Sequence, residues 1–174
     1  MQVEDALAWA TEQATTGKTA ALKALTPAQA TVVDAVAARI IPAVDGRPGA
    51  REAGVVYFVD RALATFNAEQ KTLYADGVAD LNRRAAAAHT GAASFAALTP
   101  AQQDALLHEI EQTPFFQTAR FDTIVGTFGH PDWGGNRNHA GWRLLGFEHR
   151  PVFEPPFGFY DADVNRKPQS RGKA

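Results

Sequence analysis

The order of apolar and polar residues along the chain predicts five helices, because apolar side chains recur at helical spacing in five separate segments. These segments cover about residues 27–41, 51–66, 68–88, 100–110 and 114–128, with a shorter helical stretch at residues 138–145. The positions predicted to face inward are Val32, Val33, Val36, Ile40, Ile41, Val55, Phe58, Val59, Leu63, Phe66, Leu73, Tyr74, Val78, Leu81, Leu106, Leu107, Ile110, Phe115, Phe116, Ala119, Ile124, Val125 and Phe128. The pattern therefore predicts an all-α protein, a single bundle of about five helices with negligible sheet.

Two of the helix starts share one five-residue word, Leu-Thr-Pro-Ala-Gln, which occurs at residues 25–29 and again at residues 98–102. In the first copy Thr26 is the predicted N-cap, Pro27 takes the first helical position, and Gln29 is placed to complete a capping box. The sequences that follow the two copies share only a helical pattern. We therefore interpret the repeated word as two similar caps rather than as an internal duplication.

Composition changes sharply along the chain. Residues 1–120 hold 31 alanines, which favour helix, whereas residues 121–174 hold only 3. The second part instead holds 8 of the 14 glycines, 5 of the 10 prolines and 6 of the 11 phenylalanines, which is typical of turns and irregular structure. The sequence predicts a peripheral N-terminal helix or arm over residues 1–24, a helical domain over residues 25–150 and an extended tail over residues 151–174.

The predicted tail combines prolines with aromatic residues. Pro151, Pro155, Pro156 and Pro168 disfavour both helix and central strand. Its aromatic residues are Phe153, Phe157, Phe159 and Tyr160. These side chains are too apolar for a solvated linker, so we expect the tail to lie on a surface, either its own or that of another protein.

Charge and cysteine content exclude several classes of function. The chain has 17 Lys and Arg against 19 Asp and Glu, a net charge of -2, which argues against a general nucleic-acid binder. The absence of cysteine excludes disulfides, thiolate nucleophiles and cysteine-ligated metals. No apolar run approaches the ~20 residues of a membrane span, and the start of the chain shows neither a secretory signal nor a twin arginine.

The densest group of polar residues lies in the segment 128–142, which could form a metal site or a catalytic site. A metal site would use His130, Asp132 and His139 as nitrogen and oxygen ligands, although their spacing fits no standard template. A catalytic site would use His139 or His130 as general base with Asp132 to orient it, but no activated nucleophile or oxyanion motif accompanies them. The glycines nearby follow no predicted strand and form no nucleotide-binding motif.

A structural interpretation of the same segment is better supported. Gly134, Gly135 and Asn136 tolerate the positive φ that a tight turn needs. Asn138 is placed to cap the short helix that carries Trp142. We therefore predict that this loop is structural, forms an interface, or does both.

The sequence of this loop resembles the signature of a known family, the gluconate 2-dehydrogenase subunit 3 family. The matching stretches are GTFGHPDWGGN at residues 126–136 and GWRLLGF at residues 141–147, against a pattern of roughly G-x-F-x-x-P-x-aromatic-G-G-N, then G-W, then hydrophobic-G-F or G-Y. The front of the chain also fits, at Leu25-Thr26, Arg39–Pro42, Gly54, Phe58 and Asp60. The resemblance spans about residues 25–150.

The resemblance implies a partner rather than a reaction. Members of the family are small, cofactor-free subunits that bind, stabilise and help to mature a large FAD-dependent dehydrogenase of the glucose-methanol-choline type, which oxidises sugars or glycosides. A cytochrome c is a further implied partner, as electron acceptor. The resemblance implies a periplasmic location, while the missing export signal leaves a cytoplasmic one open. We expect no cofactor in this chain and FAD in the partner subunit.

The hypothesis is thus a non-catalytic small subunit of an oxidoreductase complex acting on CH–OH groups. The residues expected at its partner interface are His130, Pro131, Trp133, Gly134, Gly135, Asn136, Arg137, His139, Trp142, Phe153, Phe157, Phe159 and Tyr160. Aromatic and arginine side chains on a backbone fixed by glycine and proline are typical of interfaces. The alternative is a stand-alone metal-binding protein or enzyme that uses His130, Asp132 and His139.

Overall fold

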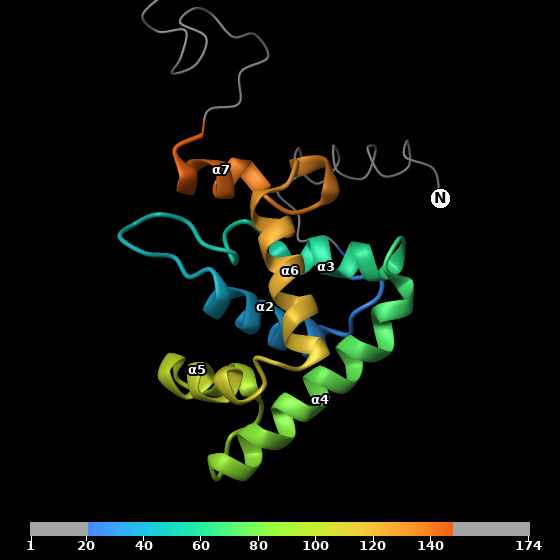
Figure 1. The fold of residues 1–174 in the computed structure, drawn as a ribbon, viewed down its shortest axis with the longest axis vertical. Coiled ribbons are helices and arrows are strands. Elements are labelled where there is room, and N and C mark those ends of the chain that lie inside the picture. Colours follow the sequence, from blue (N-terminus) through green and yellow to red (C-terminus); the bar gives the residue numbers. More distant parts are fainter. Residues whose placement is uncertain (1–20, 148–174) are drawn as a thin grey trace, which may run out of the picture.

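The computed structural model describes residues 21–147, which form an all-α fold (Figure 1). The α-helices are α2 (Pro27–Ile40), α3 (Val55–Ala64), α4 (Lys71–Ala88), α5 (Pro100–Glu109), α6 (Pro114–Phe128) and α7 (Ala140–Leu145). Four short 3-10 helices lie between them, η1 (Ala68–Gln70), η2 (Phe95–Ala97), η3 (Pro131–Trp133) and η4 (Arg137–His139). Helices make up 67% of the described residues and no strand occurs among them, so the predicted fold class is confirmed.

Most of the predicted arm (residues 1–24) and all of the predicted tail (residues 151–174) lie outside the described residues. Within residues 21–147, no helix is long and apolar enough to cross a membrane.

Both copies of the repeated word form capping boxes, as predicted. The hydroxyl oxygen of Thr26 accepts a hydrogen bond from the backbone N–H of Gln29, whose side-chain oxygen accepts one from the backbone N–H of Thr26 at 2.9 Å. Thr99 and Gln102 repeat both bonds at the start of α5. The two helices therefore begin where the sequence places them.

The second predicted helix is shorter than expected at both ends. Gly54 has φ +68°, a left-handed conformation that a right-handed helix excludes, so α3 begins at Val55 rather than near residue 51. The helix ends at Ala64, which leaves Phe66 beyond its last turn. The third predicted helix begins as the 3-10 turn η1 and continues as α4.

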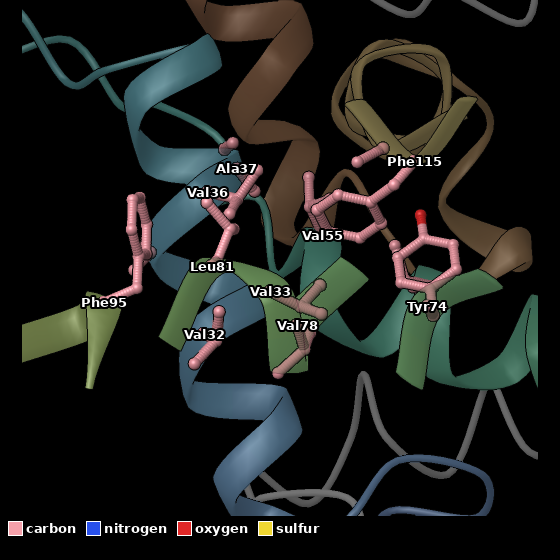
Figure 2. Packing of buried hydrophobic residues seen from close by; sticks show 14 of the residues in the cluster. Val32, Val33, Val36, Ala37, Val55, Tyr74, Val78, Leu81, Phe95 and Phe115 are labelled. Carbon is pink, nitrogen blue, oxygen red and sulfur yellow. The ribbon is translucent and has the colours of Figure 1, made fainter. Parts of the chain in front are cut away.

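The hydrophobic core lies around α2, which packs against α3, α4, α5 and α6. Figure 2 shows Val33 and Val36 of α2 beside Val78 and Leu81 of α4. The buried core residues from these helices and from η2 include Val32, Val33, Val36, Val55, Phe58, Val59, Leu63, Tyr74, Val78, Leu81, Phe95, Leu106, Leu107, Ile110, Phe115 and Ala119. Most of the positions predicted to face inward are therefore buried.

Close packing between α4 and α6 requires a glycine. A Cβ at Gly77 would lie 2.1 Å from the ring of Phe115, so only glycine allows this approach. The Phe115 ring meets Tyr74 edge-on, with centroids 5.7 Å apart.

A buried carboxylate fixes the segment that leads into α2. Asp60 of α3 is 3% exposed, and its oxygens accept hydrogen bonds from the backbone N–H groups of Lys23, Ala24 and Leu25 at 2.8, 2.9 and 2.8 Å. Asp60 thereby satisfies three donors that have no helical partner. This contact explains why an aspartate suits this position of the α3 sequence.

A second buried carboxylate lies in the core. The hydroxyl of Tyr74 donates a 2.7 Å hydrogen bond to Asp122 of α6, and both side chains are almost fully buried. Burial raises the pKa of Asp122, and the Tyr74 hydrogen bond partly offsets this effect. Burial and the neighbouring carboxylate raise the pKa of Tyr74 far above its ordinary value, so its hydroxyl stays a donor.

Candidate functional site

The segment 129–139 forms a loop that folds back over the end of α6 and reaches the start of α3. The backbone N–H of Asn136 donates to the carbonyl of Gly126 at 2.7 Å. The next N–H, that of Arg137, donates to the carbonyl of Ala53 at 3.0 Å. The loop therefore bonds both to α6 and to the segment that leads into α3, and α7 follows it directly.

The side chain of Asn136 holds both ends of this loop. Its amide nitrogen donates to the carbonyl of Gly129 at 2.8 Å, and its oxygen accepts from the backbone N–H of Gly141 at 2.9 Å. The residue is 0% exposed and has φ +44°, in the left-handed region that asparagine tolerates. The buried Asn136 side chain thus satisfies two backbone groups, the carbonyl of Gly129 in the loop and the N–H of Gly141 at the start of α7.

The predicted cap of the short helix is wrong. The sequence places Asn138 in this role, but Asn138 is exposed, has φ +52°, and lies within η4. The backbone N–H of Gly141, at the start of α7, donates to the side-chain oxygen of Asn136 instead. The physical reason is that the Asn138 side chain is exposed, whereas the buried side-chain oxygen of Asn136 lies 2.9 Å from the Gly141 nitrogen.

Two glycines let the loop and α7 approach α6. A Cβ at Gly135 would lie 2.1 Å from the carbonyl oxygen of Gly126, and a Cβ at Gly141 would lie 1.9 Å from that of Thr127. Real Cβ atoms do not come this close to a backbone oxygen. The Gly-Gly-Asn and Gly-Trp parts of the motif are therefore explained by close backbone packing.

Arg137 anchors the loop to the start of α3. Its guanidinium lies over the ring of Tyr57, with the central carbon 3.6 Å from the ring centroid, a cation–π geometry. A Cβ at Gly54 would lie 2.6 Å from the Arg137 side chain, so the arginine fills the space that this glycine leaves. Burial lowers the pKa of Arg137. Arg137, which was predicted to lie at the partner interface, thus makes contacts with Tyr57 and Gly54 of its own chain.

Trp142 of α7 is the centre of an aromatic group on the loop. Its indole N–H donates to the carbonyl of Phe128 at 2.9 Å. The His139 ring stacks on the indole at 4.9 Å with an interplanar angle of 2°, while His130 and Phe147 meet it edge-on at 5.8 and 5.4 Å. The indole is half-buried, so it both supports the loop and contributes to its surface.

The three residues of the metal hypothesis do not form a ligand set. His130 and Asp132 face each other, with Nδ1 and an Asp132 carboxylate oxygen 3.2 Å apart, while His139 stacks on Trp142. Among the described residues, no group of three histidines or carboxylates is arranged to hold a metal ion. The His130 and Asp132 side chains are half exposed, so water screens the pair. This geometry gives no support to the metal-binding or catalytic alternative.

The loop presents one exposed aromatic pair. Trp133 of η3 is 56% exposed and Phe66, just beyond α3, is 52% exposed. Their rings meet edge-on, with centroids 6.1 Å apart, and Phe66 in turn lies 6.4 Å from the buried Phe58. We call this pair the Trp133–Phe66 surface. Both rings are exposed and apolar, so they are available for contact with another molecule.

Two predictions of inward-facing residues are wrong. Phe66 is exposed because α3 ends before it, and Ile124 is 41% exposed because it lies on the outer face of α6. Sequence analysis also missed Phe121, which is 65% exposed on α6. The available signal was that the apolar residues of α6 lie on two faces, Phe115 and Ala119 on one and Phe121, Ile124 and Phe128 on the other, of which only one can face the core.

The structure sorts the predicted interface residues by exposure. His130, Trp133 and His139 are exposed, Pro131, Arg137 and Trp142 are half-buried, and Gly134, Gly135 and Asn136 are buried. Phe153, Phe157, Phe159 and Tyr160 lie outside the described residues. The exposed members are therefore available for contact, whereas the buried ones fix the backbone that presents them.

Comparison with known proteins gives one match. A family model described as gluconate 2-dehydrogenase subunit 3 matches residues 27–148. The match covers the helices α2 to α7 and the whole loop. No curated protein and no solved structure matches this chain.

Proposed function

The chain belongs to the gluconate 2-dehydrogenase subunit 3 family, and from this premise we propose that it is the non-catalytic small subunit of an FAD-dependent sugar or glycoside dehydrogenase. In this proposal it binds a large flavoprotein subunit of the glucose-methanol-choline type, stabilises it and helps it to mature. The complex works in the periplasm and passes electrons to an acceptor such as a cytochrome c.

The observation that carries the proposal is the Trp133–Phe66 surface. Large aromatic side chains bury much area for little loss of conformational entropy, which is why they dominate the energetics of interfaces. Here the loop backbone that carries Trp133 is already fixed by the Asn136 hydrogen bonds and by the close packing of Gly135. A preorganised surface loses little further entropy when a partner binds.

The proposal places FAD in the partner subunit. The described residues contain no strand, and so no βαβ unit on which a dinucleotide is usually bound. The flavin supplies the oxidation of the sugar hydroxyl in the partner. The residues of this chain act only by holding the partner in its functional conformation.

Co-expression tests this function directly. The chain is produced together with a glucose-methanol-choline type flavoprotein encoded by a neighbouring reading frame, and the flavoprotein is also produced alone. We expect the two to co-purify, and the flavoprotein to carry more FAD and more sugar-oxidising activity when the small subunit is present. The isolated small subunit should show neither flavin absorbance nor activity. Equal FAD content and activity with and without the small subunit, and no co-purification, would contradict the proposal.

A further inference from the structure

The outer face of α6 carries an apolar stripe that the core does not use. Phe121, Ile124 and Phe128 lie at helical spacings of three and four, and the first two are 65% and 41% exposed. The opposite face of the helix, with Phe115 and Ala119, already packs in the core. The stripe is thus additional to what the fold itself requires.

The stripe continues from α6 onto α7 and its C-terminal neighbour. The ring of Phe128 lies against Gly141, and the indole N–H of Trp142 is bonded to the Phe128 carbonyl. Phe147, which is 49% exposed, packs edge-on against Trp142. We call the set Phe121, Ile124, Phe128, Trp142 and Phe147 the α6 stripe. Contiguous exposed apolar residues of this kind mark an interaction site.

We propose that the α6 stripe is covered by residues 153–160 of the same chain. The described residues end at Phe147, which is itself the last member of the stripe. The chain that follows therefore starts at the surface it is proposed to cover. In Figure 1 the coloured ribbon ends just beyond α7.

The segment after Phe147 is long enough to reach the whole stripe. The thirteen residues from 147 to 160 span up to about 43 Å when extended, at roughly 3.3 Å per residue. The seven residues of α6 from Phe128 back to Phe121 cover only about 10 Å, at 1.5 Å per residue. The segment therefore reaches the whole stripe with several residues to spare.

The residues of this segment also suit an apolar surface. Four aromatic side chains, Phe153, Phe157, Phe159 and Tyr160, lie within eight residues of sequence, and Pro155 and Pro156 favour an extended path between them. The one charged residue of this stretch is Glu154, and α6 carries the exposed cation Arg120 beside the stripe.

A covering segment from the same chain also has a concentration advantage. A short connection keeps the segment at an effective concentration of about millimolar at the stripe, independent of the protein concentration. A second copy of the chain lacks this advantage. The cover does not require the flavoprotein, so it can succeed or fail independently of the proposed function.

Single cysteines test the proposal in the full-length chain, since the chain has none of its own. Ile124→Cys reports the exposure of the stripe through its rate of reaction with a maleimide. We expect this rate to be at least fivefold lower than in the same variant that also carries Phe153→Ser, Phe157→Ser, Phe159→Ser and Tyr160→Ser. Ala79→Cys, at an exposed position of α4, should react at the same rate in both backgrounds.

A second measurement identifies the covering group. The double variant Ile124→Cys, Phe157→Cys should form an intramolecular disulfide at low protein concentration. Equal maleimide rates with and without the four serine substitutions would overturn the proposal. Protection that grows with protein concentration would assign the stripe to a second copy instead. Protection that appears only when the flavoprotein is added would assign it to the partner, and both results contradict a cover by the same chain.

Discussion

The side-chain oxygen of Asn136 accepts a 2.9 Å hydrogen bond from the backbone N–H of Gly141, in a position that water does not reach. This bond joins the loop to the first turn of α7, and the other end of the same amide holds the carbonyl of Gly129. The Asn136 side chain therefore helps to fix the conformation of the loop that carries Trp133.

Replacing Asn136 should therefore destabilise the protein. Asn136→Gly keeps the tolerance for positive φ but removes both side-chain hydrogen bonds, leaving the partly buried carbonyl of Gly129 and the buried N–H of Gly141 without this partner. We expect a loss of about 3 kcal/mol in the free energy of unfolding, measured by urea denaturation. Asn138→Gly is the matched control, since Asn138 also has positive φ but is exposed, and its cost should stay below about 0.5 kcal/mol. Equal costs for the two variants would show that the buried amide is not required.

Gly141 tests the close approach of α7 to α6. Alanine favours helix over glycine by about 1 kcal/mol, so Gly141→Ala would stabilise α7 in isolation. In the folded chain its Cβ would lie 1.9 Å from the Thr127 oxygen, and we expect a net loss of about 2–4 kcal/mol instead. Gly91→Ala is the control, because a Cβ there meets nothing within 4 Å and only its φ of +86° is unfavourable. A stabilising Gly141→Ala would contradict the packing described here.

The two tryptophans of the site should behave differently. Trp142→Ala removes a half-buried ring and its hydrogen bond to Phe128, so we expect the free energy of unfolding to fall by about 2–3 kcal/mol. Trp133→Ala removes a ring that is 56% exposed, and its cost should stay below about 1 kcal/mol. Thermal or urea unfolding of both variants measures the difference. A larger loss for Trp133→Ala would reverse the assigned roles.

Asp122 should make stability depend on pH. Burial raises its pKa above the ordinary 3.8, so the folded state binds a proton that the unfolded state has already released. The free energy of unfolding should therefore fall as pH rises from about 3.8 through the raised folded pKa, and this contribution should then level off. Asp122→Asn should remove this part of the pH dependence, which urea denaturation across the acidic range measures.

Tyr74→Phe provides the complementary test. The Tyr74 hydroxyl stabilises the charged form of Asp122 by donating to it, and so holds the Asp122 pKa lower than burial alone would. Without the hydroxyl, the decline of stability should extend to higher pH than in the wild type. An unchanged pH profile would show that the hydrogen bond does not act on Asp122.

The helices were predictable from sequence because their signals are local. Thr26 with Gln29, and Thr99 with Gln102, set helix starts through contacts within four residues, and the apolar spacing of α2 identifies its buried face. The end of α3 was less predictable. Phe66 continues the apolar spacing of that helix, although the helix ends two residues earlier.

The internal geometry of the loop was not predictable, because it depends on contacts across the fold. The motif drew attention to Asn136 and to the glycines around it. The path of the loop, however, decides which asparagine accepts the hydrogen bond from the start of α7. Asn138 and His139, both exposed and in the left-handed conformation, lie between Asn136 and that helix. The exposure of the outer face of α6 was not predictable for a related reason. Phe121 and Ile124 are as apolar as the residues of this helix that are buried in the core.

The most direct test of the account is the affinity of the small subunit for the flavoprotein, measured with Trp133→Ala. We predict a dissociation constant at least tenfold higher than that of the wild type, a loss of about 1.4 kcal/mol or more, with unfolding nearly unchanged. Val44→Ala serves as the control, because Val44 is a similarly exposed apolar residue in a different loop, and its affinity should stay within about twofold of the wild type. Wild-type affinity in Trp133→Ala would contradict the central claim that the Trp133–Phe66 surface binds the dehydrogenase subunit.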